Sequence, residues 1–231
     1  ISPLVDLTNY LMLEMGQPMH AFDSSQVESG IVVRSTKEAI AFKTLDGSER
    51  MLPEDVLLIC NKEKPVAIAG IMGGENSEIH GKTTSILLES AAFEGSSTRK
   101  SSTRIGLRTE ASSRYEKMLD PNMTVTAIQR FVKLLKDMQP DVQFTSALTD
   151  IYCSKLEPID ITITKPYIDR YIGNTLDMEK IVDILRSLDF KVDVDNDTLN
   201  IKVPTFRATK DITMKVDIIE EITRVYGYDN I

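Results

Sequence analysis

Alternating hydrophobic and polar residues in the first half of the chain predict a series of β-strands. Residues 31–59 alternate and break as a β-meander does, with an Asp-Gly pair in a hairpin-turn position. The run PVAIAGIMGG (65–74) is strand-like and ends in two glycines. The run TSILLESAAF (84–93) has the continuous hydrophobicity of a buried strand, interrupted by the carboxylate of Glu89. That carboxylate needs solvent, an ion-pair partner or a ligand, because burying it alone would be costly.

Helical periodicity predicts two helices in the same region. Thr8 is expected to cap a short helix over NYLMLEMG that Gly16 closes. Asp120 and Pro121 are expected to open a longer helix that ends before Pro140. Its apolar residues recur at helical spacing, namely Val125, Ile128, Val132 and Leu135.

The character of the chain changes near residues 151–160, where SKLEPIDI predicts a connector to a second unit. Asp177 precedes a helix with the apolar residues Ile181, Ile184, Leu185 and Leu188. FKVDV and LNIKV flank the turn Asp195-Asn196-Asp197 as a hairpin, and Pro204 stops the second strand. A final amphipathic helix carries Val216, Ile219, Ile222 and Tyr226.

Helix, hairpin and helix in this order resemble a winged-helix arrangement. The predicted fold class is therefore α+β, with two domains. A mixed β-sheet domain with flanking helices is expected over residues 1–152, and a small winged-helix-like α+β domain over residues 157–231.

Length and composition agree with two soluble domains, since 231 residues at 42% hydrophobic can form one large core or two smaller ones. No apolar run approaches the roughly 20 residues of a membrane span, and no signal peptide is visible, so we expect a cytoplasmic protein without a membrane partner. The start at Ile1 rather than Met predicts a segment of a longer protein. Cys60 and Cys153 lie far apart and are expected to be buried thiols.

A net charge of −8 argues against a broad nucleic-acid-binding surface, but one segment departs from this balance. Residues 99–117 contain six basic residues but only two acidic ones, Glu110 and Glu116. The basic residues are Arg99, Lys100, Arg104, Arg108, Arg114 and Lys117. This segment predicts either contacts with phosphates or an ordinary solvated surface, and the sequence leaves both open.

Several catalytic classes have no motif here. The chain lacks the Gly-x-Ser-x-Gly of serine hydrolases, the Gly-Lys-Ser/Thr of a P-loop and the dinucleotide-binding fingerprint. Its two histidines, His20 and His80, are too far apart in sequence for a zinc motif. An active site, if present, is expected to work without a metal ion or a protein nucleophile.

Four blocks resemble, in order, the β subunit of bacterial phenylalanyl-tRNA synthetase. They are VDLTNYLMLEMGQPMHAFD (5–23), AIAGIMGGENSEI (67–79), SILLESAAFEGSSTRKSSTRIGLRTEASSRYEKMLDP (85–121) and VPTFRATKDITMKVDIIEEITRVYGYDNI (203–231). The resemblance implies an editing domain, which hydrolyses tyrosine wrongly attached to tRNA(Phe), followed by the small winged-helix-like domain.

The same resemblance implies the partners and cofactors of the parent enzyme. These are an alpha subunit in an (alpha-beta)2 heterotetramer, tRNA(Phe), and ATP with Mg²⁺ at a synthetic active site that belongs to the other subunit. None of the motifs of that site is visible in this chain, so no cofactor is expected here.

An apolar phenylalanine pocket rejects an isostere with one added hydroxyl only weakly, by a factor on the order of a hundred. A second, hydrolytic pocket with a buried partner for the phenol would supply the missing discrimination, because phenylalanine leaves that partner unpaired. Glu89 matches the family's acceptor for the tyrosine hydroxyl. Gly73, Thr109 and Ala111 match pocket-lining positions, although a tight turn at Gly73 and helix packing at Ala111 would explain the same residues.

Thr8 and Asn9 also match site positions, although a helix cap explains them equally well. His20 matches the family's editing histidine; taken alone, a histidine after a proline turn is more often structural. We expect His20 or Asn9 to orient the attacking water, with help from the 3′-terminal ribose. His80 has no match and is expected at the surface. Ser113 stands where many members carry histidine, and Leu119 where many carry glycine, so we assign neither a catalytic role.

Two other functions remain open from the sequence. A noncatalytic tRNA-binding or assembly module would keep the fold without turnover. A DNA-binding winged helix is less favoured, because the acidic residues of the second unit outnumber its basic ones.

Overall fold

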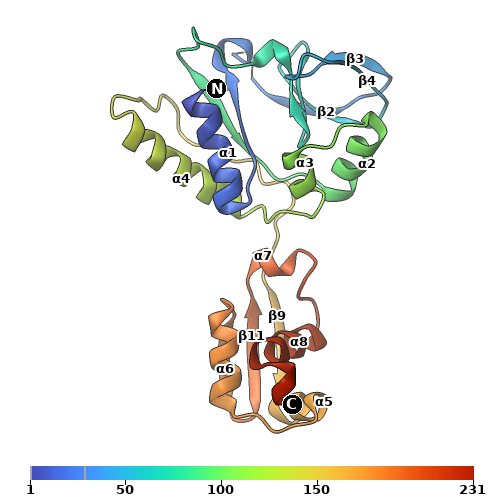
Figure 1. The fold of residues 1–231 in the computed structure, drawn as a ribbon, viewed down its shortest axis with the longest axis vertical. Helices are drawn as coiled ribbons and strands as arrows, with labels where there is room; N and C mark the ends of the chain where they lie inside the picture. Colours follow the sequence, from blue (N-terminus) through green and yellow to red (C-terminus); the bar gives the residue numbers. More distant parts are fainter. Residues whose placement is uncertain (1, 29) are drawn as a thin grey trace. The chain divides into compact units, whose positions relative to one another are not determined.

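The computed structural model describes residues 2–28 and 30–231, which form two compact units (Figure 1). Unit 1 is Ile1–Tyr152 and unit 2 is Cys153–Ile231. Each unit combines antiparallel strands with helices, which confirms the predicted α+β fold class.

The described part of unit 1 is built from short antiparallel strands and four helices. Its strands are β1 (Met19–Asp23), β2 (Val32–Ser35), β3 (Ile40–Lys43), β4 (Glu49–Leu52), β5 (Leu57–Cys60), β6 (Pro65–Ile68), β7 (Met72–Gly73) and β8 (Ile86–Ser90). Its helices are α1 (Pro3–Met15), α2 (Gly95–Ile105), α3 (Glu110–Tyr115) and α4 (Met123–Met138). Short 3₁₀ turns lie at Ser24–Gln26 and Glu75–Ser77.

Among the residues of unit 1 that the structure describes, the strands form three sheets and not one simple meander. β2, β5, β6 and β7 make a four-stranded sheet in that order, β3 and β4 form a separate hairpin, and β1 pairs with β8. The Asp-Gly turn of the hairpin is confirmed, with Gly47 in the left-handed region at φ 77°. The predicted meander is wrong in its connections, because β2 pairs with β5 across the hairpin.

Helices α1 and α4 pack against each other beside β1 and β8 (Figure 1). Their contact buries Leu7 and Leu11 of α1 and Phe131 and Leu135 of α4, so α4 turns only part of its predicted stripe inward. Val125, Ile128 and Val132 are only half-buried. A helix that packs on one neighbour from one side buries a narrower stripe than its periodicity alone suggests.

Both predicted helix starts in unit 1 are displaced. α1 begins at Pro3, so Thr8 lies inside the helix and does not cap it; its hydroxyl donates to the Val5 carbonyl at 2.9 Å. Proline suits a first helical turn because its missing N–H has no partner there anyway. α4 begins at Met123, after a turn in which Asp120 accepts from the backbone N–H of Asn122.

Two burial predictions in unit 1 and at the start of unit 2 are wrong. β8 is half-buried rather than buried, with Leu87 39% exposed, because it pairs with β1 alone and its other edge has no partner strand among the described residues. Cys60 is buried as expected, whereas Cys153 is exposed. A cysteine in a connecting segment has no core to enter.

Unit 2 is a three-stranded antiparallel sheet, in the order β10-β11-β9, with helices packed on it. Its elements are β9 (Ile159–Thr164), α5 (Lys165–Ile172), α6 (Met178–Ser187), β10 (Lys191–Asp195), β11 (Thr198–Val203), α7 (Thr205–Ala208), α8 (Lys215–Tyr226) and a 3₁₀ turn at Tyr228–Asn230. The predicted hairpin is confirmed, and Asn196 takes a left-handed conformation at its turn. Asp177 precedes α6 as predicted, and its side chain caps the helix by accepting from the N–H of Glu179.

The core of unit 2 joins α6, α8 and the sheet, with Ile181, Leu185, Leu199 and Ile222 fully buried. Val216 is exposed, contrary to the predicted face of the last helix, because Ile218 takes the inward position instead. The predicted connector is also too long, since β9 already begins at Ile159.

Candidate active site

The pairing of β1 with β8 brings His20 opposite Glu89. Gly16 ends α1 in the left-handed conformation at φ 74°, and the chain turns through Pro18 into β1. The register then sets His20 against Glu89 as direct cross-strand partners. Opposite residues of an antiparallel pair lie on the same face of the sheet. The histidine and the carboxylate predicted from distant sequence blocks are therefore neighbours.

The backbone of Gly73 lies directly against the imidazole of His20. A Cβ atom at Gly73 would stand 2.6 Å from Cε1 and 2.7 Å from Nε2 of His20, and 2.9 Å from Cδ1 of Leu45. Such distances are shorter than van der Waals contact, so no larger residue fits without displacing a neighbour. Close approach, rather than a special backbone angle, is what requires glycine here.

Burial shifts both titratable groups away from their usual behaviour. It lowers the pKa of His20 to about 4, so the imidazole is neutral at pH 7. It raises the pKa of Glu89 to about 7, so the carboxyl titrates near neutrality. Opposite shifts on two adjacent groups are typical of sites that bind or react.

Neither Nε2 of His20 nor the carboxylate of Glu89 has a hydrogen-bond partner within residues 2–28 and 30–231. Nε2 of His20 is buried and has no hydrogen-bond partner there. Among the same residues no hydrogen bond or ion pair reaches the Glu89 carboxylate, although its side chain is half-buried. Buried polar groups are normally paired, so unpaired groups on one face indicate a place for a ligand.

Gln17 and Tyr115 complete this neighbourhood, and the sequence did not single them out. The Gln17 side chain is 2% exposed; its Nε2 donates to the carbonyls of Pro18 (3.0 Å) and Ala91 (2.8 Å), while Oε1 is buried without a partner among the described residues. The Tyr115 hydroxyl donates to the Pro18 carbonyl at 3.1 Å. Its pKa is raised by burial and then by the negative charge of Glu89, so the phenol lies near that carboxylate.

Thr109 ties the start of α3 to the strand that ends in Gly73. Its hydroxyl donates to the carbonyl of Ile71 at 2.9 Å and accepts from the N–H of Ser112 at 3.0 Å in a capping box. Ile71 lies two residues before Gly73, so Thr109 is anchored beside the segment that packs on His20. Ala111 follows in the first turn of α3 and is half-buried.

The remaining predicted site residues, Thr8 and Asn9, have no hydrogen bond or ring contact with this group among the described residues. Thr8 is buried in α1 with its hydroxyl bonded within the helix, and Asn9 is exposed. No hydrogen bond or ring contact links either of them to His20 within the part of the chain that the structure describes. His80 lies at the surface as predicted, and Ser113 accepts from Nε of Arg108.

Metal ligands and membrane spans are also absent from the described residues. No three His, Cys, Asp or Glu side chains in 2–28 and 30–231 gather in a way that could hold a metal ion. Over the same residues, every helix is too short or too polar to cross a bilayer.

We expect Gly73→Ala to disturb the site through the imidazole it contacts. The new methyl group must displace His20 or Leu45, and overpacking of this kind costs about 2 kcal/mol. Urea unfolding should show this loss, whereas Gly81→Ala, in open surroundings, should change stability by less than about 0.5 kcal/mol. Equal stability of the two variants would contradict the contact.

Comparison with protein families assigns both units. Residues 1–140 match the B3/4 domain, and residues 161–228 match the tRNA synthetase B5 domain. Because the first match spans more than half of the sequence, the chain belongs to the B3/4 domain family.

The particular proteins it is similar to are phenylalanine–tRNA ligase beta subunits. The protein from Clostridium tetani is 43% identical over 232 residues, and that from Protochlamydia amoebophila is 42% identical over 233 residues. Each comparison covers all of this chain and 29% of the relative, so the chain spans less than a third of their length. The resemblance predicted from the four sequence blocks is confirmed.

A solved structure shows the same fold. It is an N-terminal fragment of the phenylalanyl-tRNA synthetase beta subunit from Pyrococcus horikoshii, with a TM-score of 0.52 and 16% sequence identity. The match covers 97% of this chain and 65% of that one. At this identity the likeness concerns the fold alone.

Proposed function

We propose that unit 1 hydrolyses the ester of tyrosine wrongly attached to tRNA(Phe), as the editing part of a phenylalanine–tRNA ligase beta subunit. The observation that carries the proposal is the pairing of His20 with Glu89 on one face of the β1–β8 sheet, where the buried Nε2 of His20 and the half-buried carboxylate of Glu89 both lack a partner among the described residues. The matches to beta subunits over the whole chain support it.

Selection of tyrosine rests on Glu89 in this proposal. The carboxylate accepts a hydrogen bond from the phenol of the misplaced tyrosine, which the structure leaves possible because no protein group occupies it among the described residues. Phenylalanine would leave the buried carboxylate unpaired, at a cost of about 1 to 3 kcal/mol or more. Gly73, Thr109 and Ala111 shape the slot for the ring.

Hydrolysis proceeds in this proposal by attack of water on the ester carbonyl. The water oxygen bonds to the carbonyl carbon, the ester C–O bond breaks, and the 3′-terminal ribose leaves with the proton that the water loses. His20 is neutral at pH 7, so its unpartnered Nε2 can accept a hydrogen bond from that water. Asn9, with Thr8 beside it, is the second candidate for orienting the water, from the exposed side of α1.

The whole enzyme would supply the remaining functions. We propose an alpha subunit as partner in an (alpha-beta)2 assembly, tRNA(Phe) as substrate and the cytoplasm as location. ATP and Mg²⁺ would act at the synthetic site, which the family resemblance places in the other subunit.

Deacylation of tyrosyl-tRNA(Phe) by the whole enzyme tests the proposal. Glu89→Ala and His20→Ala should each lower the hydrolysis rate at least about tenfold, which corresponds to losing one hydrogen bond to a charged or reacting group. His80→Ala is the matched control, because His80 lies at the surface, and its rate should equal the wild type. Rates within twofold of the wild type for both site variants would overturn the assignment.

A noncatalytic RNA-binding role is the second candidate, and the basic segment around α2 favours it. Single-turnover assays separate the two functions: a binding module would retain tyrosyl-tRNA(Phe) without releasing tyrosine, whereas the editing site releases it.

A further inference from the structure

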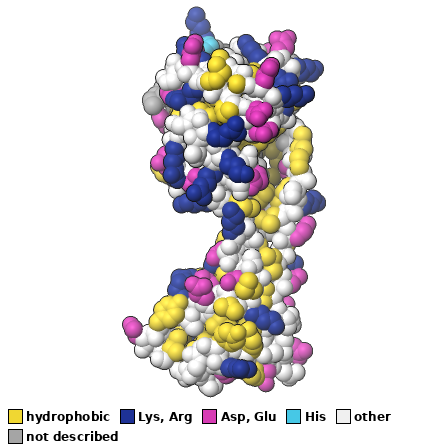
Figure 2. Space-filling view, turned by 90° about the vertical axis from the view of Figure 1, so that its right-hand side faces the viewer, with side chains coloured by type: hydrophobic (Ala, Val, Ile, Leu, Met, Phe, Trp, Pro, Cys, Tyr) yellow, Lys and Arg dark blue, Asp and Glu magenta, His cyan; other side chains and the backbone are white. Residues whose placement is uncertain are grey.

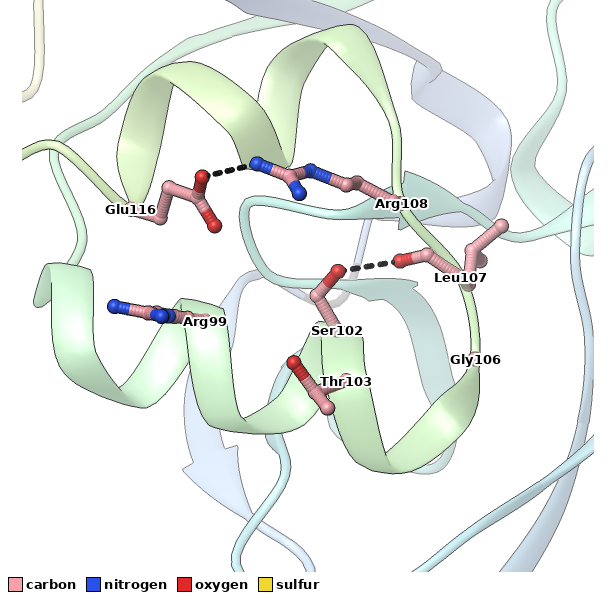
Figure 3. A pocket seen from close by; sticks show the side chains of 7 residues that line it. All are labelled: Arg99, Ser102, Thr103, Gly106, Leu107, Arg108 and Glu116. Carbon is pink, nitrogen blue, oxygen red and sulfur yellow. Dashed lines mark hydrogen bonds and ion pairs between the residues drawn. The ribbon is translucent and has the colours of Figure 1, made fainter.

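A polar cavity lies between α2 and α3, and neither His20 nor Glu89 lines it. Its volume is about 310 Å³, at the lower end of the range for small-ligand pockets. Figure 3 shows its lining, in which the Arg108 side chain reaches across to Glu116, while Arg99 extends from α2 on the side of Glu116. The remaining lining residues are Ser102, Thr103, Gly106 and Leu107.

The two arginines of the cavity differ in their partners. Arg108 donates from Nη2 to Glu116 at 2.5 Å and from Nε to Ser113 at 3.3 Å, and its side chain is 70% exposed. Arg99 makes no hydrogen bond or ion pair within the described residues, and its guanidinium is free to meet a ligand. Since Glu116 neutralises one arginine at most, the cavity keeps a positive charge.

The surface around the cavity is also basic, in a chain whose net charge is −8. Arg114 pairs with Glu110, but Lys100 and Lys117 have no carboxylate partner among the described residues, and Arg104 donates only to the Glu54 carbonyl. Figure 2 shows Lys and Arg side chains gathered on the face of unit 1 that carries α2. Such a local excess attracts polyanions.

We propose that this cavity binds a phosphate and its ribose from single-stranded RNA, through Arg99 and Arg108. The size suits a single nucleotide unit, the guanidinium groups suit phosphate oxygens, and the Thr103 hydroxyl and the Glu116 carboxylate can pair with ribose hydroxyls. A free metabolite anion would not use the basic surface outside the cavity, whereas a longer RNA strand does.

The position of the cavity links it to the proposed editing site. Arg108 lines the cavity, and the next residue, Thr109, bonds to Ile71 in the segment that leads to Gly73 and His20. A strand held at Arg108 is therefore bound beside the place where its esterified end would enter. Only this link to the esterified end of the RNA rests on the proposed function. The cavity and its charges do not depend on whether unit 1 hydrolyses an ester.

Fluorescence anisotropy with a labelled 12-nucleotide single-stranded RNA, which carries no amino acid, tests the proposal on the 231-residue chain. Arg99→Gln should weaken binding about tenfold and lower the slope of log affinity against log salt by about 0.7, the value for one lost phosphate contact. Arg34→Gln is the control, since it removes an exposed arginine from β2 of the same unit, and should match the wild type. Thermal unfolding should show both variants folded.

Binding of the Arg99→Gln variant within twofold of the wild type, or no measurable binding by the wild type in 50 mM salt, would overturn the inference. This outcome is distinct from failure of the proposed function, because the RNA probe bears no ester. RNA binding that does not depend on Arg99 contradicts the cavity proposal alone, whereas unchanged deacylation in the Glu89 and His20 variants contradicts the editing site alone.

Discussion

Replacing Ala111 by tryptophan is expected to reduce hydrolysis of tyrosyl-tRNA(Phe) to background, more than about a hundredfold below the wild type. Ala111 is half-buried in the first turn of α3, directly after the Thr109 cap that ties this helix to the segment before Gly73. In the proposed slot an indole would take the space of the substrate ring, and loss of productive binding lowers kcat/KM as a whole.

Ala111→Ser provides the matched control, because serine adds one atom at the same position and should keep most of the activity. Far-UV circular dichroism and thermal unfolding should show that the tryptophan variant is folded, since the position is partly open to solvent. Hydrolysis by a folded Ala111→Trp variant at more than about a tenth of the wild-type rate would show that Ala111 does not line the slot.

Opposite pH dependences of stability are expected from His20 and Glu89. Folding raises the pKa of Glu89 from 4.5 to about 7, so the folded protein retains a proton that the unfolded chain loses, and stability falls as the pH rises through this window. Folding lowers the pKa of His20 from 6.5 to about 4, so the unfolded chain binds the extra proton, and stability rises from pH 4 to 6.5. Each shift corresponds to about 3 kcal/mol, and in the wild type the two largely offset each other.

Single variants should expose each contribution in urea unfolding between pH 4 and 7.5. Relative to the wild type, Glu89→Gln should gain about 3 kcal/mol as the pH rises from 4.5 to 7, and His20→Asn should lose about as much from pH 4 to 6.5. Carboxylates elsewhere titrate equally in all three proteins and cancel in these differences. Difference curves that stay flat within about 0.5 kcal/mol would show that neither group is desolvated as the structure indicates.

The sequence predicted the fold class and most helices and strands correctly. The reason is that the spacing of hydrophobic residues and the residue types at caps and turns act over a few neighbouring residues. Gly16 closes α1, Asp177 caps α6 and the Asn196 turn joins β10 to β11, as their residue types predict. The errors arose where tertiary contacts decide. Thr8 lies inside α1 rather than at its start, and β2 pairs with β5 across an intervening hairpin.

The candidate site was only partly readable for the same reason. The family resemblance predicted Glu89 and His20 from two separate sequence blocks. That they lie directly opposite each other follows from the register of β1 with β8. Gln17 and Tyr115 were missed because an amide in a turn and an aromatic residue in a short helix carry no local signal of a shared site. Thr8 and Asn9 remain proposals, since neither makes a hydrogen bond to His20 in the described residues.

The sequence by itself therefore determined the family, the α+β class and the residue types from which a tyrosine-selective pocket would be built. Only the tertiary structure decided that Gly73 must lack a side chain, that the imidazole is neutral and that the Glu89 carboxyl titrates near neutrality. The physical reason is that steric exclusion and desolvation depend on atoms brought from distant parts of the chain, and no local pattern of residues encodes those neighbours.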